Sequence, residues 1–160
     1  MSAGNKFTLQ LGAFVNAYRA RAYDVVREVV IEVAKNLEKA SPVGNRELWA
    51  ANIKRKARGL PPLPEGYVGG TFRHNWQYGN DLSGVPTGVL VGTENDSVER
   101  ISAQIPAVGA ANMKHTLINN TAYALELERG HSGQAPQGMV GLAVVEFQDA
   151  VDKAAAKVRK

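Results

Sequence analysis

The sequence predicts an α+β domain in which a long N-terminal helix, a short helix and a C-terminal helix pack on a small antiparallel β-sheet. The first observation behind this prediction is a run of apolar residues at steps of three and four between residues 11 and 37, the pattern of an amphipathic helix. The second is the alternation of side chains between residues 71 and 79, which is typical of a half-buried strand. A chain of 160 residues, 44% hydrophobic and 21% charged, has the size and composition of one globular domain, so we expect a single domain over residues 1–160.

The N-terminal helix is predicted over residues 7–39. Its apolar stripe consists of Leu11, Val15, Tyr18, Ala22, Val25, Val29, Val33 and Leu37. Ser41 and Pro42 supply a stop, because the residue before a proline is pushed out of the helical region. At 1.5 Å per residue this helix is roughly 50 Å long, whereas a compact globule of this chain length is roughly 40 Å across. We therefore expect the helix to reach past its own core, where another copy of the protein would cover its stripe.

Residues 44–70 are expected to form an exposed arm or insertion. Positive charges at Arg46, Lys54, Arg55, Lys56 and Arg58 are followed by three prolines and, after the prolines, three glycines. A short helix is predicted over residues 47–57, around Leu48, Trp49 and Ile53. Residues 59–70 contain too many prolines and glycines for regular structure.

Three strands are predicted. Residues 71–79 place Phe72, His74, Trp76 and Tyr78 on one face. Residues 88–93 (GVLVGT) resemble a second strand, and the turn residues between the two predict a hairpin. Residues 115–119 (HTLIN) are the third candidate.

Three shorter helices are expected after residue 95. Asp96 and Glu99 resemble a capping pair at the start of a short helix. Residues 122–129 form a second helix, capped by Asn120 or Thr121 and ended by Gly130. Pro136 suits the first turn of the final helix. The apolar stripe of that helix consists of Val140, Ala143, Phe147, Ala150, Ala154 and Val158.

The candidate catalytic and metal-binding residues lack the sequence spacing that such sites require. His74, His115, His131, Glu126 and Glu128 are metal-ligand types, but no pair has HExxH or similar spacing. The GHSG segment at residue 130 is one residue short of a GxSxG nucleophile elbow, and no glycine-rich phosphate loop is present. The chain has no cysteine. We therefore expect no enzyme activity, metal or cofactor.

The best candidates for contact with DNA or an acidic partner are the basic residues Lys54, Arg55, Lys56 and Arg58. Clustered positive charges release counterions from a phosphate backbone, and this release favours binding. A solvated loop is the simpler interpretation, and a formal charge of +4 is mild. No stretch approaches the roughly 20 apolar residues that cross a bilayer, and no secretory signal is expected.

The segment 115–148 carries a recognisable pattern of an apolar strand, a Tyr-Ala pair, an acidic residue before glycine, and a Gln-Ala-Pro turn into a last helix. The residues that match this pattern are Asn119, Tyr123, Ala124, Glu128, Gly130, Ser132, Gln134, Ala135, Pro136 and Gly138. The pattern resembles the tail-completion proteins of long-tailed phages, including the minor tail and head-tail joining proteins of lambda-like phages. Ser41-Pro42-Val43 and the segment 70–76 (GTFRHNW) agree with the same family in the same order. One departure is the stretch 44–69, which the family lacks.

The resemblance implies a structural virion protein, formed in the host cytoplasm, that assembles as a homo-oligomeric ring, commonly a hexamer, in the phage neck or tail. Its partners would be the tail terminator and the head-tail connector, with transient non-specific contact with genomic DNA in the channel and no membrane. The interface candidates are Leu11, Val15, Tyr18, Trp49, Trp76, Tyr123, Ser132, Gln134 and Pro136. The alternative is a soluble DNA-binding protein that uses the basic segment at residues 54–58.

Overall fold

A computed structural model describes residues 3–65 and 67–159, and within residues 3–11 it describes only the side chain of Gln10. The fold is α+β, as the sequence predicts, with a long N-terminal helix and a two-stranded antiparallel sheet. The elements are α1 (Ala3–Ala40), η1 (Arg46–Leu48), α2 (Ala50–Lys56), α3 (Thr71–His74), β1 (Trp76–Asn80), α4 (Ser97–Gln104), η2 (Ala110–Asn112), β2 (His115–Asn119), α5 (Ala124–Glu128), α6 (Val140–Val145) and α7 (Phe147–Val158).

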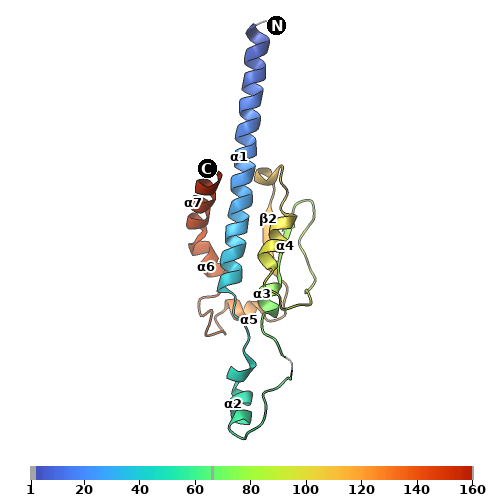
Figure 1. The fold of residues 1–160 in the computed structure, drawn as a ribbon, viewed down its shortest axis with the longest axis vertical. Coiled ribbons are helices and arrows are strands. Elements are labelled where there is room, and N and C mark those ends of the chain that lie inside the picture. Colours follow the sequence, from blue (N-terminus) through green and yellow to red (C-terminus); the bar gives the residue numbers. More distant parts are fainter. Residues whose placement is uncertain (1–2, 66, 160) are drawn as a thin grey trace.

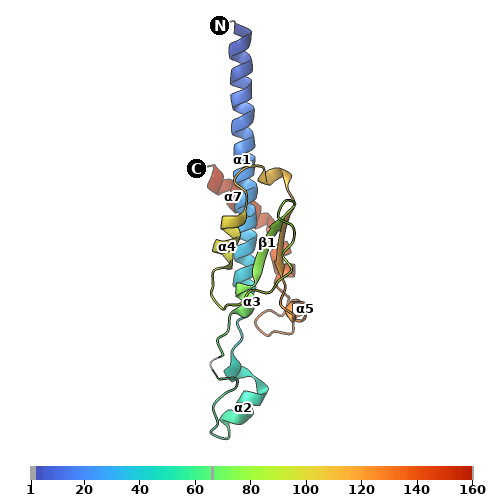
Figure 2. The same cartoon turned by 90° about the vertical axis from the view of Figure 1, so that its right-hand side faces the viewer.

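The molecule is elongated, because two elements leave its body in opposite directions (Figures 1 and 2). The N-terminal half of α1 projects from one end, and the arm that contains α2 hangs from the other. No helix within the described ranges is both long and apolar enough to cross a membrane.

Helix α1 is the axis on which the body is built. Its 38 residues correspond to about 57 Å at 1.5 Å per residue. The C-terminal half buries Val30, Ile31, Ala34 and Leu37, because α4 and α7 pack against it. Residues 12–21 are all exposed, so the predicted overhang is present.

The sheet pairs β1 with β2, and the hairpin predicted between residues 71–79 and 88–93 is wrong. Trp76 lies opposite Asn119, and Tyr78 lies opposite Leu117. The third candidate strand is therefore confirmed as β2. Its pairing with β1 could not be read from the turn signal, which marks only the local reversal at Asn80 and Gly84.

Residues 88–93 form no strand because side-chain amides take the place of backbone pairing. The amide of Asn75 donates to the carbonyl of Leu90 (3.0 Å) and accepts from its N–H (2.7 Å). The amide of Gln77 donates to the carbonyl of Gly88 (2.8 Å). The segment is thus held beside β1 by side-chain hydrogen bonds and not by the backbone hydrogen bonds of a β-ladder.

The strand predicted over residues 71–79 begins as a helical turn, α3. The turn is closed by the N–H of Asn75, which donates to the carbonyls of Thr71 and Phe72 at 3.1 Å each. Gly70 starts it with φ +125°, and a Cβ there would lie 2.5 Å from the carbonyl oxygen of Thr93, so only glycine fits. The strand therefore begins only at Trp76.

Helix α4 is present, but the predicted capping pair is wrong. The Asp96 carboxylate accepts from Arg100 and lies 2.8 Å from His74 Nδ1. The first turn of α4 is capped by Glu38 of α1, which accepts from the N–H of Val98 (3.2 Å) and from the hydroxyl of Ser97. The N-terminal cap of α4 therefore comes from a residue about 60 positions away in the sequence and not from a neighbouring residue.

Helix α5 ends at Glu128 and is terminated by Gly130 as predicted, since Gly130 has φ +84° in the left-handed region. The predicted side-chain cap is wrong, because Asn120 donates to the carbonyl of Pro86 (2.9 Å) and the Thr121 hydroxyl donates to Asn119 (2.9 Å). The single final helix is also wrong. It is divided at Glu146 into α6 and α7, and Pro136 lies four residues before α6 begins.

Candidate interaction surfaces

The end of α1 is fixed by the buried residue Ser41. Its hydroxyl donates to the carbonyl of Leu37 (2.6 Å) and accepts from the indole N–H of Trp76 (2.7 Å). Its carbonyl accepts from Arg73 (2.9 Å). Trp76 is 3% exposed, so in the described structure this interface candidate is a core residue, and its role in an interface stays a prediction.

The arm meets the body at a depression that we call the waist groove, with a volume of about 690 Å³. Four of the interface candidates line it: Trp49, Tyr123, Ser132 and Gln134. The full lining comes from residues 42–49, 67–72 and 123–134, so three separate parts of the sequence are brought to one surface. The remaining candidate from the C-terminal motif, Pro136, is exposed but is not part of this lining.

Aromatic contacts shape both walls of the waist groove. The rings of Trp49 and Tyr67 meet edge-on at 5.0 Å between centroids. Phe72 and Tyr123 lie 5.9 Å apart. Burial, together with the nearby Tyr67, raises the pKa of the Tyr123 phenol above its ordinary value. The phenol is therefore a neutral hydrogen-bond donor at physiological pH.

The base of the arm is closed by Gln134. Its side-chain amide donates to the carbonyl of Val43 (3.0 Å) and accepts from its N–H (3.2 Å), a pairing like that of two strand residues. The N–H of Gln134 in turn donates to the Ser132 hydroxyl (3.2 Å). Two residues of the sequence motif thus hold the insertion against the body.

Glu128 has an architectural role that the sequence does not reveal. Its carboxylate accepts from the N–H groups of Met139 (2.8 Å), Val140 (2.9 Å) and Gly141 (2.9 Å) at the start of α6. Gly138 has φ +74°, and a Cβ there would lie 2.5 Å from this carboxylate. Gly138 follows Glu128 by ten positions, and this spacing alone does not reveal the contact.

The arm is an ordered element, because its centre is hydrogen-bonded through a buried side chain. The amide of Asn52 donates to the carbonyls of Arg46 (2.8 Å) and Leu63 (2.7 Å) and accepts from the N–H of Leu63 (2.9 Å). Its apolar residues remain uncovered: Leu48 is 69% exposed and Ile53 is 55% exposed.

The basic residues predicted to contact DNA lie at the tip of this arm, on and after α2. Lys54, Lys56 and Arg58 are exposed. Arg55 is half-buried and donates from Nε to the carbonyl of Pro61 (2.9 Å). Three of the four predicted residues therefore present their charge to solvent, and one supports the arm.

The three histidines are held by different elements. His74 is buried with its Nδ1 3.5 Å from Glu94, in addition to its contact with Asp96. Burial acts to raise the pKa of Asp96, but hydrogen bonds from Arg100 and His74 outweigh it and hold that pKa below its ordinary value.

The other two histidines each have a different partner. His115 lies 2.8 Å from the Tyr78 hydroxyl, and His131 pairs with Glu126 at 2.7 Å on the surface. In the part of the chain that the structure describes, no three histidine or acidic side chains form a group that could hold a metal ion.

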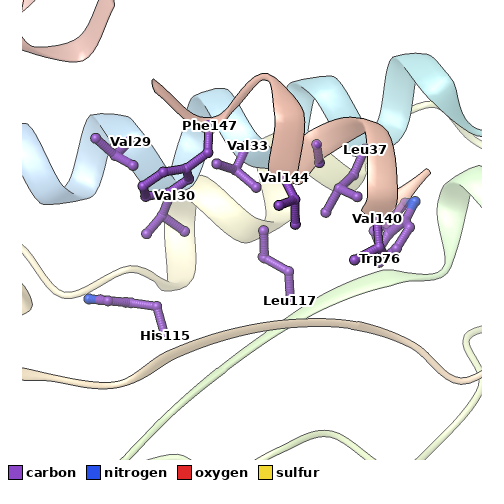
Figure 3. Close-up of a pocket in the computed structure, with 11 residues that line it drawn as sticks. Val29, Val30, Val33, Leu37, Trp76, His115, Leu117, Val140, Val144 and Phe147 are labelled. Atoms are coloured by element: carbon purple, nitrogen blue, oxygen red, sulfur yellow. The ribbon is translucent and has the colours of Figure 1, made fainter. Parts of the chain in front are cut away.

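A second depression, which we call the α1–α6 groove, was not predicted. Figure 3 shows its side chains between α1, α6 and the two strands, enclosing a volume of about 400 Å³. Its lining is apolar apart from His115 and includes Val29, Val33, Leu117, Val144 and Phe147. Val144 is 69% exposed and Phe147 is 50% exposed, so the mouth of the groove is an uncovered apolar surface.

The projecting half of α1 carries the remaining interface candidates. Tyr18 is 70% exposed and Val15 is 37% exposed, and the neighbouring Phe14 is 68% exposed. The side chain of Leu11 lies outside the described part of the chain. Comparison with family models, with curated proteins and with solved structures finds no match to this chain.

Proposed function

We propose that this chain is a structural protein of a long-tailed phage particle, which forms a hexameric ring that completes the tail and joins it to the head connector around the DNA channel. The observation that carries the proposal is that both projecting elements carry uncovered apolar side chains. Phe14 and Tyr18 on α1, and Leu48 and Ile53 on the arm, are each more than half exposed. Such surfaces mark protein–protein contacts.

The positions of these surfaces favour assembly over binding of a small molecule. They lie at opposite ends of an elongated body (Figure 2). A ring subunit needs one surface for each neighbour, and a neck protein needs further surfaces toward the rings above and below it. The projecting α1 suits the first role, and the arm suits the second.

The residues that carry the resemblance to tail-completion proteins support the proposal through the framework they build. Ser41 fixes the end of α1, Gln134 closes the arm, and Glu128 caps α6. These are the contacts of a rigid scaffold that presents surfaces. The protein would be made in the host cytoplasm and would remain in the neck or tail of the virion, without enzymatic activity.

The mass of the purified protein in solution, measured by light scattering at two salt concentrations with and without its tail and connector partners, tests the proposal. We expect a discrete ring, or a monomer that becomes a ring when the partners are added. A chain that stays monomeric or dimeric with its partners present, and binds free duplex DNA instead, would contradict the ring.

DNA binding through the arm tip is the second candidate function, favoured by the exposure of Lys54, Lys56 and Arg58. We expect replacement of all three by alanine to reduce the slope of log affinity for duplex DNA against log salt by about 2.7, since each phosphate contact contributes about 0.9. Binding titrations at several salt concentrations give this slope.

The matched control removes the same charge elsewhere, by replacing Lys39, Lys114 and Lys153, which are also exposed, with alanine. If the control lowers the slope as much as the arm variant does, binding follows net charge and the arm is not a DNA site.

A further inference from the structure

The exposed half of α1 has the residue spacing of a helix that docks into a groove. Val15, Tyr18 and Ala22 continue the stripe at steps of three and four, with Phe14 beside them. Peptide helices that bind apolar grooves present anchors at the same steps. In the described structure residues 12–21 are all exposed, so no other element buries the side chains of this stretch.

The α1–α6 groove offers the matching acceptor. Val144, which is 69% exposed, and Phe147, which is 50% exposed, lie at its mouth. Val33 and Leu117 line it more deeply. Figure 3 shows these side chains directed toward one another across the groove. An aliphatic cleft rimmed by one aromatic ring suits the apolar side chains of a helix.

Charge is complementary between the two surfaces. Residues 3–23 contain three basic residues, Lys6, Arg19 and Arg21, and no carboxylate. The segment 140–152, which includes the groove-lining residues of α6 and the start of α7, contains three carboxylates, Glu146, Asp149 and Asp152, and the next basic residue along α7 is Lys153. Among the described residues, no salt bridge involves Arg19, Arg21 or any of these three carboxylates.

The helix cannot reach the groove of its own chain. Val29 and Val33, which line the groove, belong to the same continuous helix as Tyr18. A bundle of projecting helices from several copies would instead bring basic segments together without a compensating carboxylate. The groove of a second copy, where the carboxylate of Glu146 adjoins the lining residue Phe147, is therefore the better acceptor.

We propose that the projecting half of α1 from one copy docks into the α1–α6 groove of the next copy. The contact is head-to-tail, so each copy gives a helix and receives one, and repetition of the contact closes a ring if the rotation permits. This inference rests on the proposed ring and names the surfaces that join its subunits.

Single cysteines test the contact directly, because the natural chain contains no cysteine. The Tyr18→Cys and Val144→Cys variants are mixed in equal amounts and treated with a short bis-maleimide linker. We expect mixed dimers at roughly tenfold the yield of a control pair, since docking raises the local concentration of one thiol at the other. Phe14→Cys with Phe147→Cys repeats the test at a second pair of positions.

The control pair combines Tyr18→Cys with Val91→Cys, because Val91 is fully exposed and lies outside the groove. All of these substitutions are at exposed positions, and unchanged circular dichroism confirms that each variant folds. A yield equal to that of the control pair, or a predominance of Tyr18→Cys homodimers, overturns the docking.

The mass of the unmodified protein separates this failure from that of the proposed function. A ring that forms without enriched cross-links at these positions overturns the docking contact alone. A protein that never assembles, even with its partners, overturns the docking and the ring together.

Discussion

Replacing Trp76 by alanine is expected to lower the free energy of unfolding by about 3–5 kcal/mol, the range for removal of a buried aromatic side chain. The indole is 3% exposed, contacts Phe72 at 5.9 Å between centroids, and donates to Ser41. Its loss would open a cavity beside the α1–α6 groove, which Trp76 also lines. Urea denaturation followed by circular dichroism measures the effect.

Two further variants separate packing from hydrogen bonding. Trp76→Phe keeps an aromatic ring but removes the N–H, so a smaller loss of about 1–2 kcal/mol is expected. Trp49→Ala changes an indole that is 40% exposed and should have less effect than Trp76→Ala. If the two alanine variants were equally destabilised, the core position of Trp76 would be refuted.

Replacing Glu128 by alanine is expected to lower the free energy of unfolding by about 2–3 kcal/mol. Hydrogen bonds to a charged group contribute about 1.5–3 kcal/mol each, but water can replace part of the lost bonding at exposed N–H groups. The three donors are the N–H groups of Met139, Val140 and Gly141. Thermal and urea unfolding curves give the difference.

The matched control is Glu126→Ala, two residues earlier on the same helix. Among the described residues the Glu126 carboxylate pairs only with His131 on the surface, and exposed ion pairs contribute about 0–1 kcal/mol. Glu128→Gln should fall between the two, because one carboxylate oxygen becomes an NH₂ group that faces N–H donors. An equal loss in the free energy of unfolding for Glu128→Ala and Glu126→Ala would show that the cap at α6 is not important for stability.

The elements that could be predicted are those whose signal lies within the element itself. The stripe of α1 repeats over more than seven turns, and the apolar run of β2 has the length of a strand. The breakers around Pro61 and Pro64 mark the irregular half of the arm. In each case neighbouring residues alone determine the local structure.

The failed predictions are those in which a distant side chain replaces a local partner. Glu38 caps α4 where Asp96 was expected to, and the amide of Asn75 holds residues 88–93 where a strand ladder was expected. Neither contact has a periodicity that a sequence pattern could reveal.

The candidate surfaces were likewise predicted in part: the sequence pointed to residues of the waist groove but not to the α1–α6 groove. The motif residues Tyr123, Ser132 and Gln134 do meet Trp49 at the waist groove. The α1–α6 groove was missed because its lining comes from α1, β1, β2, α6 and the start of α7, and each side chain taken alone resembles an ordinary core residue.

No other element covers the stretch of α1 between residues 12 and 21. The number of residues in this stretch therefore determines both how far the helix projects and which way its side chains face. One inserted residue there would advance everything before it by 1.5 Å and turn it by 100°, which moves Phe14 to another side of the helix. Seven inserted residues would advance it by about 10.5 Å and return it to within about 20° of its starting direction. Relatives with longer or shorter first helices should therefore differ in steps of about seven residues, and their bodies should be spaced in corresponding increments.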